Sequence, residues 1–256
     1  MTALGVVLCG VVGLAMGSFL NVAIHRVPLK QSVVRPRSRC PGCGVEVKPK
    51  DNIPVVSWLL LRRRCRSCRA PISVRYPLVE LVTAALFVVM AVRFGADPAL
   101  PAFLVLAAAL VAISAIDLEH FIVPNRIVYP ALFMMVPLLV VAAVVDDAWS
   151  SLARAAIGGA IAWSALLVIH LISPRGMGFG DVRLAGLIGV PLGWLGLGHV
   201  PVGLFLGFAS ASVVGIALIL CGRKGRKDKV PFGPFLASGA IGAILFGRAI
   251  LKWYGV

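Results

Sequence analysis

The sequence predicts an all-α, polytopic membrane protein with about eight transmembrane helices and one sizeable cytoplasmic loop. Three observations support this fold class. Hydrophobic residues make up 60% of the 256 residues and charged residues only 14%, whereas about half of the residues of a soluble domain are apolar. The mean hydropathy is +0.98. Apolar stretches of membrane-spanning length recur along the chain, and basic residues collect between alternate stretches.

The apolar stretches define the expected helices, since a bilayer core about 30 Å thick needs roughly 20 apolar residues per helix. They lie near residues 2–24, 77–94, 99–116, 127–145, 152–172, 182–198, 201–221 and 235–253. A cleaved signal peptide is the alternative for the first stretch. It is disfavoured because no basic residue precedes the stretch and no small-residue cleavage site follows it.

The distribution of basic residues gives the orientation, since cytoplasmic loops collect Lys and Arg. With an external N-terminus, the inside segments are 25–76, 117–126, 173–183 and 222–234, and they hold 21 of the 25 Lys and Arg residues. The net charge of +15 therefore reflects membrane topology. Nucleic-acid binding is the rival interpretation of so basic a chain, but few aromatic residues accompany the positive charges for base stacking.

Four of the six cysteines lie in the segment 25–76, as the pairs Cys40/Cys43 and Cys65/Cys68, with 21 residues between the pairs. Two C-x-x-C turns can complete a tetrahedral sulfur shell around Zn²⁺, and the usual separation is about 15–20 residues. Such a closed site is structural. Two disulfides or free thiols are the alternatives, and a reducing cytosol disfavours disulfides.

Six of the ten acidic residues lie in loops where solvent would simply hydrate them, namely Glu46, Asp51, Asp97, Asp146, Asp147 and Asp228, whereas Asp117 and Asp181 do not. Asp117 ends the third apolar stretch and Asp181 opens the sixth, and the topology puts both on the cytoplasmic side. Acids at membrane depth are costly and indicate a functional site. The alternative is a pair of interfacial acids, solvated or bridged to Arg126 and Arg183.

Two carboxyls that share one site hold one proton between them, as in aspartic proteases. The glycines Gly176, Gly178 and Gly180 precede Asp181 closely, and glycine permits close backbone approach and positive φ. We therefore expect this segment to position an extended substrate; an ordinary turn is the alternative. Because Asp181 opens a helix and Asp117 ends one, the helix dipole predicts that Asp117 is the protonated partner before substrate binds.

Several motifs resemble the type IV prepilin peptidases, also called leader peptidases of type II secretion. They read GSFLNV (17–22), CPGC and CRSC, RYPLVELVTAALF (75–87), AIDLEHFIVPN (115–125), GMGFGDVRLAG (176–186) and PFGPFLA (231–237). The resemblance implies an eight-helix GxGD-type aspartic protease of the bacterial inner membrane. Its partners would be prepilin and pseudopilin substrates and the lipid bilayer, with no nucleic acid.

The resemblance also implies roles for individual residues. Asp117 and Asp181 would be the catalytic pair, Gly178 and Gly180 the motif glycines, and the four loop cysteines the zinc ligands. Residues 1–24 would form the first transmembrane helix, 25–76 the zinc-binding loop and methyl-transfer region, and 77–256 the peptidase domain. Family members commonly N-methylate the new terminus with S-adenosylmethionine.

Three positions depart from the family pattern: Arg183 replaces a common lysine, Arg63 a usual glycine, and Asp51 a commoner glutamate. If Arg63 and Asp51 serve methyl transfer, that activity is affected while proteolysis is not. Other function classes remain open. A transporter could use Asp117 and Asp181 as relay groups, whereas a metalloprotease would need an H-E-x-x-H pattern, which the scattered histidines lack.

Overall fold

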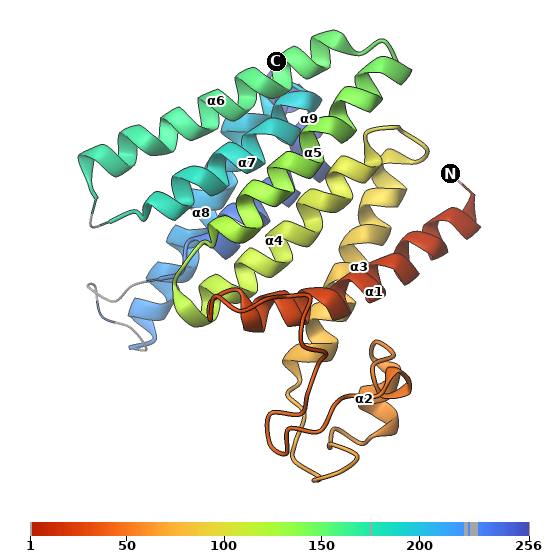
Figure 1. The fold of residues 1–256 in the computed structure, drawn as a ribbon. Helices are drawn as coiled ribbons and strands as arrows, with labels where there is room; N and C mark the ends of the chain where they lie inside the picture. Colours follow the sequence, from red (N-terminus) through yellow and green to blue (C-terminus); the bar gives the residue numbers. More distant parts are fainter. Residues whose placement is uncertain (1, 175, 223–224, 226–229, 256) are drawn as a thin grey trace. The chain divides into compact units, whose positions relative to one another are not determined.

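A computed structural model of the chain describes residues 2–174, 176–222, 225 and 230–255 (Figure 1). Among these residues the regular elements are helices, with two isolated β-bridges in the loop after the first helix. The helices are α1 (Ala3–Arg26), η1 (Pro49–Asp51), α2 (Val56–Leu60), α3 (Arg75–Phe94), α4 (Leu100–His120), α5 (Asn125–Val145), α6 (Trp149–Ile172), α7 (Phe179–Leu195), α8 (His199–Leu220) and α9 (Gly233–Trp253). The predicted all-α class is confirmed.

Seven helices in the described part of the chain are long and apolar enough to cross a membrane, namely α1, α3, α4, α5, α6, α8 and α9. The remaining long helix, α7, has 17 residues, which is the lower end of the length that a bilayer requires. Each expected apolar stretch thus coincides with a long helix. Prolines at 130, 137 and 191 lie inside α5 and α7, as transmembrane helices tolerate.

The chain forms two compact units, residues 1–96 and 97–256. In the first unit, α1 packs on α3 through glycines. A Cβ at Gly13 would lie 2.7 Å from the Cα of Ala84, and one at Gly17 would lie 2.6 Å from the Cα of Glu80. Only glycine allows the two backbones to approach this closely. The loop 27–74 between these helices carries η1, α2 and the four cysteines.

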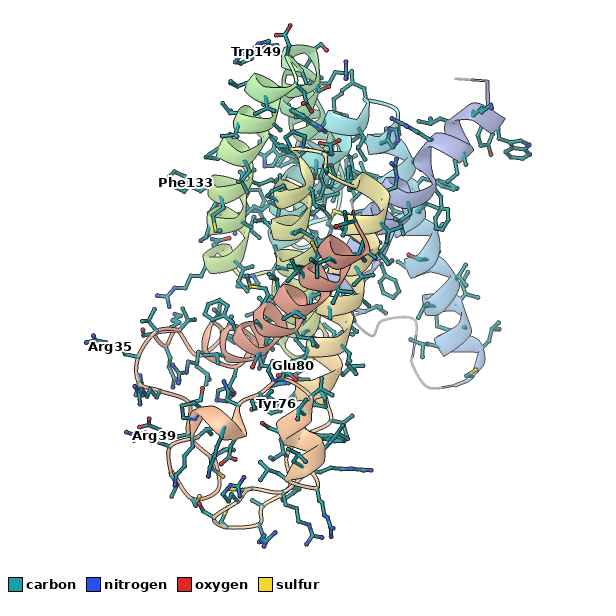
Figure 2. All side chains as sticks on the ribbon, turned by 90° about the vertical axis from the view of Figure 1, so that its right-hand side faces the viewer. Arg35, Arg39, Tyr76, Glu80, Phe133 and Trp149 are labelled. Carbon is teal, nitrogen blue, oxygen red and sulfur yellow. The ribbon has the colours of Figure 1, made fainter. Side chains whose placement is uncertain are left out.

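The second unit is a bundle of six helices in which α4 is the most buried of the spanning helices. Leu106, Ile113 and Ile116 of α4 are fully buried. The helices α6 and α7 pack closely, since a Cβ at Gly158 would lie 2.6 Å from the Cα of Gly193. Apolar side chains also cover the outside: Phe133 of α5 is 80% exposed and points away from the bundle (Figure 2). An apolar exterior around an apolar core fits a lipid solvent.

Candidate active site

Asp117 lies in the last turn of α4 and is only 4% exposed. Its Oδ2 accepts a 2.8 Å hydrogen bond from the backbone N–H of Gly233, the first residue of α9. A Cβ at position 233 would lie 2.9 Å from the same oxygen. The close approach of the α9 backbone to the carboxyl therefore requires glycine. The helix α4 ends just beyond, where Phe121 caps it in the left-handed conformation and donates to the Asp117 carbonyl.

Asp181 lies in the first turn of α7 and is 9% exposed. The backbone N–H of Gly178, the residue that caps α7, hydrogen-bonds to its carboxyl. The charge of Asp117 acts on Asp181, so the two carboxyls, which are far apart in sequence, are close enough to interact. Both belong to the second unit. The sequence suggested this pairing from the membrane depth of the two acids together with the resemblance to the leader peptidases.

Nearby arginines do not neutralise the pair. In the described residues, no ion pair joins Asp117 or Asp181 to Arg126 or Arg183. Arg183 instead donates a 2.6 Å hydrogen bond to Oδ1 of Asn125 at the start of α5, and its guanidinium lies 4.5 Å from the ring centroid of Phe179. These contacts tie the starts of α5 and α7 together and bind Arg183 to Asn125 and Phe179.

The glycine segment 176–180 lies against its surroundings at short range. A Cβ at Gly180 would lie 2.9 Å from the Cβ of Val123, which follows α4. Gly178 has φ −71°, and Gly180 is not among the described glycines with positive φ. For Gly180 the reason for glycine is therefore close approach, which is one of the two properties named for this segment.

His170 anchors the same segment, which sequence reasoning did not foresee. Its Nδ1 lies 2.8 Å from the carbonyl oxygen of Met177, and its ring centroid lies 5.5 Å from that of Phe179. The side chain of Met177 is buried. A histidine at the end of an apolar stretch carries no sequence signal for such a contact, since an interfacial histidine looks the same.

The structure changes the helix-dipole argument for the pair. Asp181 lies at the N-terminus of α7, as predicted, but Asp117 receives an N–H from the N-terminus of α9. Helix N-termini favour nearby negative charge. Asp117 therefore lies between the C-terminal end of α4 and the N-terminal end of α9, whose dipoles act in opposite directions, whereas Asp181 lies at a helix N-terminus only. That Asp117 is the protonated partner stays a prediction.

The four loop cysteines of the first unit come together. Their sulfur atoms all lie within 4.8 Å of one another, and Sγ of Cys40 is 3.7 Å from Sγ of Cys68. A tetrahedral site with Zn–S bonds of about 2.3 Å separates its sulfurs by about 3.8 Å, so the cluster could hold a zinc ion. All six cysteines are free, which does not favour the disulfide alternative.

The ionisation of the four cysteine thiols also bears on metal binding. Backbone N–H groups of Cys68 and Ser67 lower the pKa of the Cys65 thiol to about 6. The N–H of Ala70 acts in the same direction on Cys68, yet the neighbouring thiols, with that of Cys43 first, raise the pKa of Cys68 to about 11. The thiols therefore do not ionise independently of one another, and a metal ion that binds them would release their protons.

The two cysteine turns repeat one backbone pattern. The N–H groups of Cys40 and Cys65 donate to the carbonyls five residues ahead, and the N–H groups of Gly44 and Arg69 donate back to the cysteine carbonyls. Gly44 has φ +71° and Arg69 has φ +61°. Arginine therefore occupies, in the second turn, a left-handed position that glycine fills in the first.

The two departures in the loop have structural roles. Arg63, at the usual glycine position, has φ +62°, the conformation for which glycine is best suited. Its guanidinium lies 5.1 Å from the ring centroid of Trp58. Asp51 accepts three hydrogen bonds of 3.1, 2.9 and 2.6 Å from Arg66 in the second cysteine turn, and this arginine lowers the pKa of Asp51. Both residues therefore support the loop conformation.

Sequence reasoning missed Glu80, a buried acid in α3 that is 7% exposed. Its Oε2 accepts a 2.8 Å hydrogen bond from the backbone N–H of Val55, and its carboxyl also bonds the Ser18 side chain of α1. Figure 2 labels Glu80 beside Tyr76, whose carbonyl accepts from Asn21. An acid inside the expected span 77–94 was a sufficient signal, by the rule that indicated Asp117.

Taken together, the helices, the buried acid pair and the cysteine cluster define a polytopic membrane protein with a carboxyl-pair site and a separate loop able to bind metal. The bacterial peptidase A24 N-terminal domain matches residues 11–94, and the type IV leader peptidase family matches residues 104–220. This chain belongs to the type IV leader peptidase family, which confirms the resemblance seen in the sequence.

Relatives with curated names agree. A prepilin leader peptidase/N-methyltransferase of Aeromonas hydrophila is 36% identical over 272 residues, which cover 94% of this chain and 90% of that protein. Proteins of the same name from Bacillus subtilis and Myxococcus xanthus are 34% and 42% identical, over 94% and 86% of this chain and 94% and 65% of their own lengths. No solved structure matches.

Proposed function

We propose that this protein is a membrane aspartic endopeptidase that removes the basic leader from type IV prepilins and pseudopilins, just before their apolar helix. The observation that carries the proposal is the convergence of two buried carboxyls, Asp117 and Asp181, at the adjoining ends of α4 and α7. The relatives' names supply the substrate class. They do not support the transporter alternative.

Asp117 and Asp181 would act as a pair that shares one proton. The ionised carboxyl takes a proton from a water molecule, which attacks the scissile carbonyl carbon. The protonated carboxyl donates to the carbonyl oxygen, and a proton then passes to the leaving amine as the C–N bond breaks. The N–H groups of Gly233 and Gly178 would hold the two carboxyls in place throughout.

The cleavage would take place at the cytoplasmic face of the inner membrane. A basic leader stays on the cytoplasmic side by the same rule that keeps the basic loops there. We assign the segment Gly176–Gly180 to hold the extended substrate beside Asp181. Glu119 is exposed in the last turn of α4, two residues from Asp117, and offers a negative charge to the leader.

We also propose that the first unit supports N-methylation of the newly exposed terminus. The methyl donor would be S-adenosylmethionine, whose sulfonium loses its methyl group to the terminal amine. Zinc bound by Cys40, Cys43, Cys65 and Cys68 would be structural, since four sulfur ligands leave no open coordination position. The departures at Arg63 and Asp51 affect the loop and therefore bear on this second activity alone.

Co-expression with a prepilin tests the peptidase. Asp117→Ala and Asp181→Ala should each abolish the mobility shift of the processed pilin, because neither carboxyl alone can both activate water and protonate the leaving group. Asp146→Ala is the matched control, since this exposed acid follows α5 at the end away from Asn125. Processing that persists in both active-site variants would refute the assignment.

Mass spectrometry of the processed pilin tests the second activity separately. We expect the N-terminus to carry one added methyl group in cells with wild-type enzyme. Cys40→Ser should reduce bound zinc and methylation while leaving cleavage largely intact. Elemental analysis of the purified protein should give one zinc per chain; its absence would remove the structural role proposed for zinc.

A further inference from the structure

The short helix α2 presents its apolar side chains outward. Val56, Leu59 and Leu60 are 47%, 60% and 76% exposed, and Ile53 just before the helix is 49% exposed. Within the helix, residues 56 and 60 are four positions apart and share one face. The polar Ser57 is instead buried at 6%, and its hydroxyl bonds to Lys50 O and Ile53 N. A helix that faces water exposes its polar side chains and buries its apolar ones, and α2 does the opposite.

Hydrogen bonds fix α2 beside the first turns of α3. The N–H of Val55 donates to Glu80, the sixth residue of α3, and Trp58 Nε1 donates at 3.2 Å to the carbonyl of Ile72, just before α3. At 1.5 Å per residue, Glu80 lies about 8 Å from the start of that helix. Both figures show α2 next to this part of α3.

The depth of α2 relative to the bilayer can be inferred from its position beside α3, because α3 is apolar enough to cross a membrane. The headgroup region of a bilayer leaflet is about 5–8 Å thick. If the membrane-spanning part of α3 begins with its first turns, the exposed face of α2 lies where the headgroups meet the acyl chains. An outward apolar face is stable there and costly in water.

The charged residues that flank α2 in the sequence are mostly positive, and the acid bonded to its N-terminal end, Glu80, is buried. Arg62, Arg63 and Arg64 follow the helix directly, and Lys50 precedes it. The nearest acid in sequence, Asp51, is bound to Arg66, so it does not offset them. An apolar face flanked by cations is the pattern of a segment that lies in the interface of an anionic membrane.

We propose that residues 53–64 form an interfacial anchor that inserts Ile53, Val56, Leu59 and Leu60 into the cytoplasmic leaflet. The flanking arginines bind the phosphates of anionic lipid headgroups. The anchor holds the cysteine loop at the membrane surface, and Glu80 sets its depth through Val55. This role does not depend on the peptidase or methyl-transfer assignments.

Photocrosslinking from single sites in the full chain tests the anchor. The photoreactive residue p-benzoylphenylalanine replaces Ile53, Leu60 or Val45, and each protein is reconstituted in vesicles of phosphatidylcholine with or without phosphatidylglycerol. Val45 is the matched control, because it is 48% exposed, nearly as much as Ile53, but its carbonyl accepts from the N–H of Cys40 in its own turn. We expect lipid adducts from positions 53 and 60 at several times the yield from position 45.

The charge requirement is tested with the double substitution Arg62→Gln/Arg64→Gln. The adduct yield at position 60 should rise with phosphatidylglycerol in the wild-type background and lose that dependence in the double variant. Adducts at 53 and 60 with another part of the chain or with a second copy, in place of lipid, would overturn the proposal. So would equal lipid yields at 45, 53 and 60.

Discussion

The backbone N–H of Gly233 donates a 2.8 Å hydrogen bond to Oδ2 of Asp117, across 116 positions of sequence. The contact brings the start of α9 to the end of α4, inside the second unit. It fixes one oxygen of a buried carboxyl. Gly233 lies beyond residues 104–220, which match the leader peptidase family.

Gly233→Ala should lower kcat for prepilin cleavage by about 100-fold, because a catalytic group displaced by about 1 Å can cost that much. The added Cβ would lie 2.9 Å from Oδ2 of Asp117 and must displace it. KM for the prepilin should change little, since Gly233 acts on the carboxyl. Steady-state kinetics in detergent measures both constants.

Gly215→Ala is the control for this substitution. A Cβ at Gly215 of α8 meets no atom within 4 Å, so the same chemical change should leave kcat at the wild-type value. Equal kcat values for the two variants would contradict the positioning role of Gly233.

The motif glycines should differ from each other. Gly180→Ala brings a Cβ to 2.9 Å from the Cβ of Val123, whereas Gly178→Ala brings one only to 3.4 Å from Oδ2 of Asp181, with φ −71° acceptable to alanine. Gly180→Ala should therefore reduce cleavage more than Gly178→Ala. Val123→Gly should restore part of the activity of Gly180→Ala. The reverse order in a gel-mobility time course would show that close packing is not what selects glycine at 180.

The sequence predicted the helices because a bilayer imposes length and apolarity on each span. It indicated Asp117 and Asp181 as candidate site residues, because an acid at membrane depth is costly and is rarely kept there without a function. It did not predict Gly233 at Asp117 or His170 at Met177, because neither contact lies within one helix and glycine and histidine are common at helix ends. The positive φ of Arg63 and Arg69 could not be predicted either, since arginine is not a residue that indicates a left-handed backbone position.

The cysteine turns offer a test at Arg69 and Gly44. Arg69→Gly relieves a left-handed residue, which stabilises the turn by about 1 kcal/mol, while Gly44→Ala introduces the same strain. Gly44 has no neighbour within 4 Å of an added Cβ, so the effect there is conformational. Zinc release to a chelator should be slower than wild type in Arg69→Gly and, for about 1 kcal/mol of strain, about five-fold faster in Gly44→Ala. Unchanged rates in both would mean that the turns do not limit metal retention.

Glu80→Ala should loosen the loop 27–74 of the first unit. The change leaves the Val55 N–H without its acceptor, which costs about 1–3 kcal/mol for a buried donor, and Val55 is a β-branched residue held at φ +61°. Limited trypsin digestion should cleave at Arg62–Arg64 faster than in wild type. Glu80→Gln, which keeps an acceptor, should be milder.

Glu46→Ala is the control, because it also removes an acidic side chain from the first unit. Glu46 pairs with the exposed Arg37 at 3.0 Å, and such surface pairs contribute little to stability. Its digestion should match wild type. Val55→Gly in the Glu80→Ala background should slow digestion again, since glycine adopts positive φ without the strain of valine. If Val55→Gly gives no recovery, Glu80 supports the loop by some contact other than its hydrogen bond to Val55.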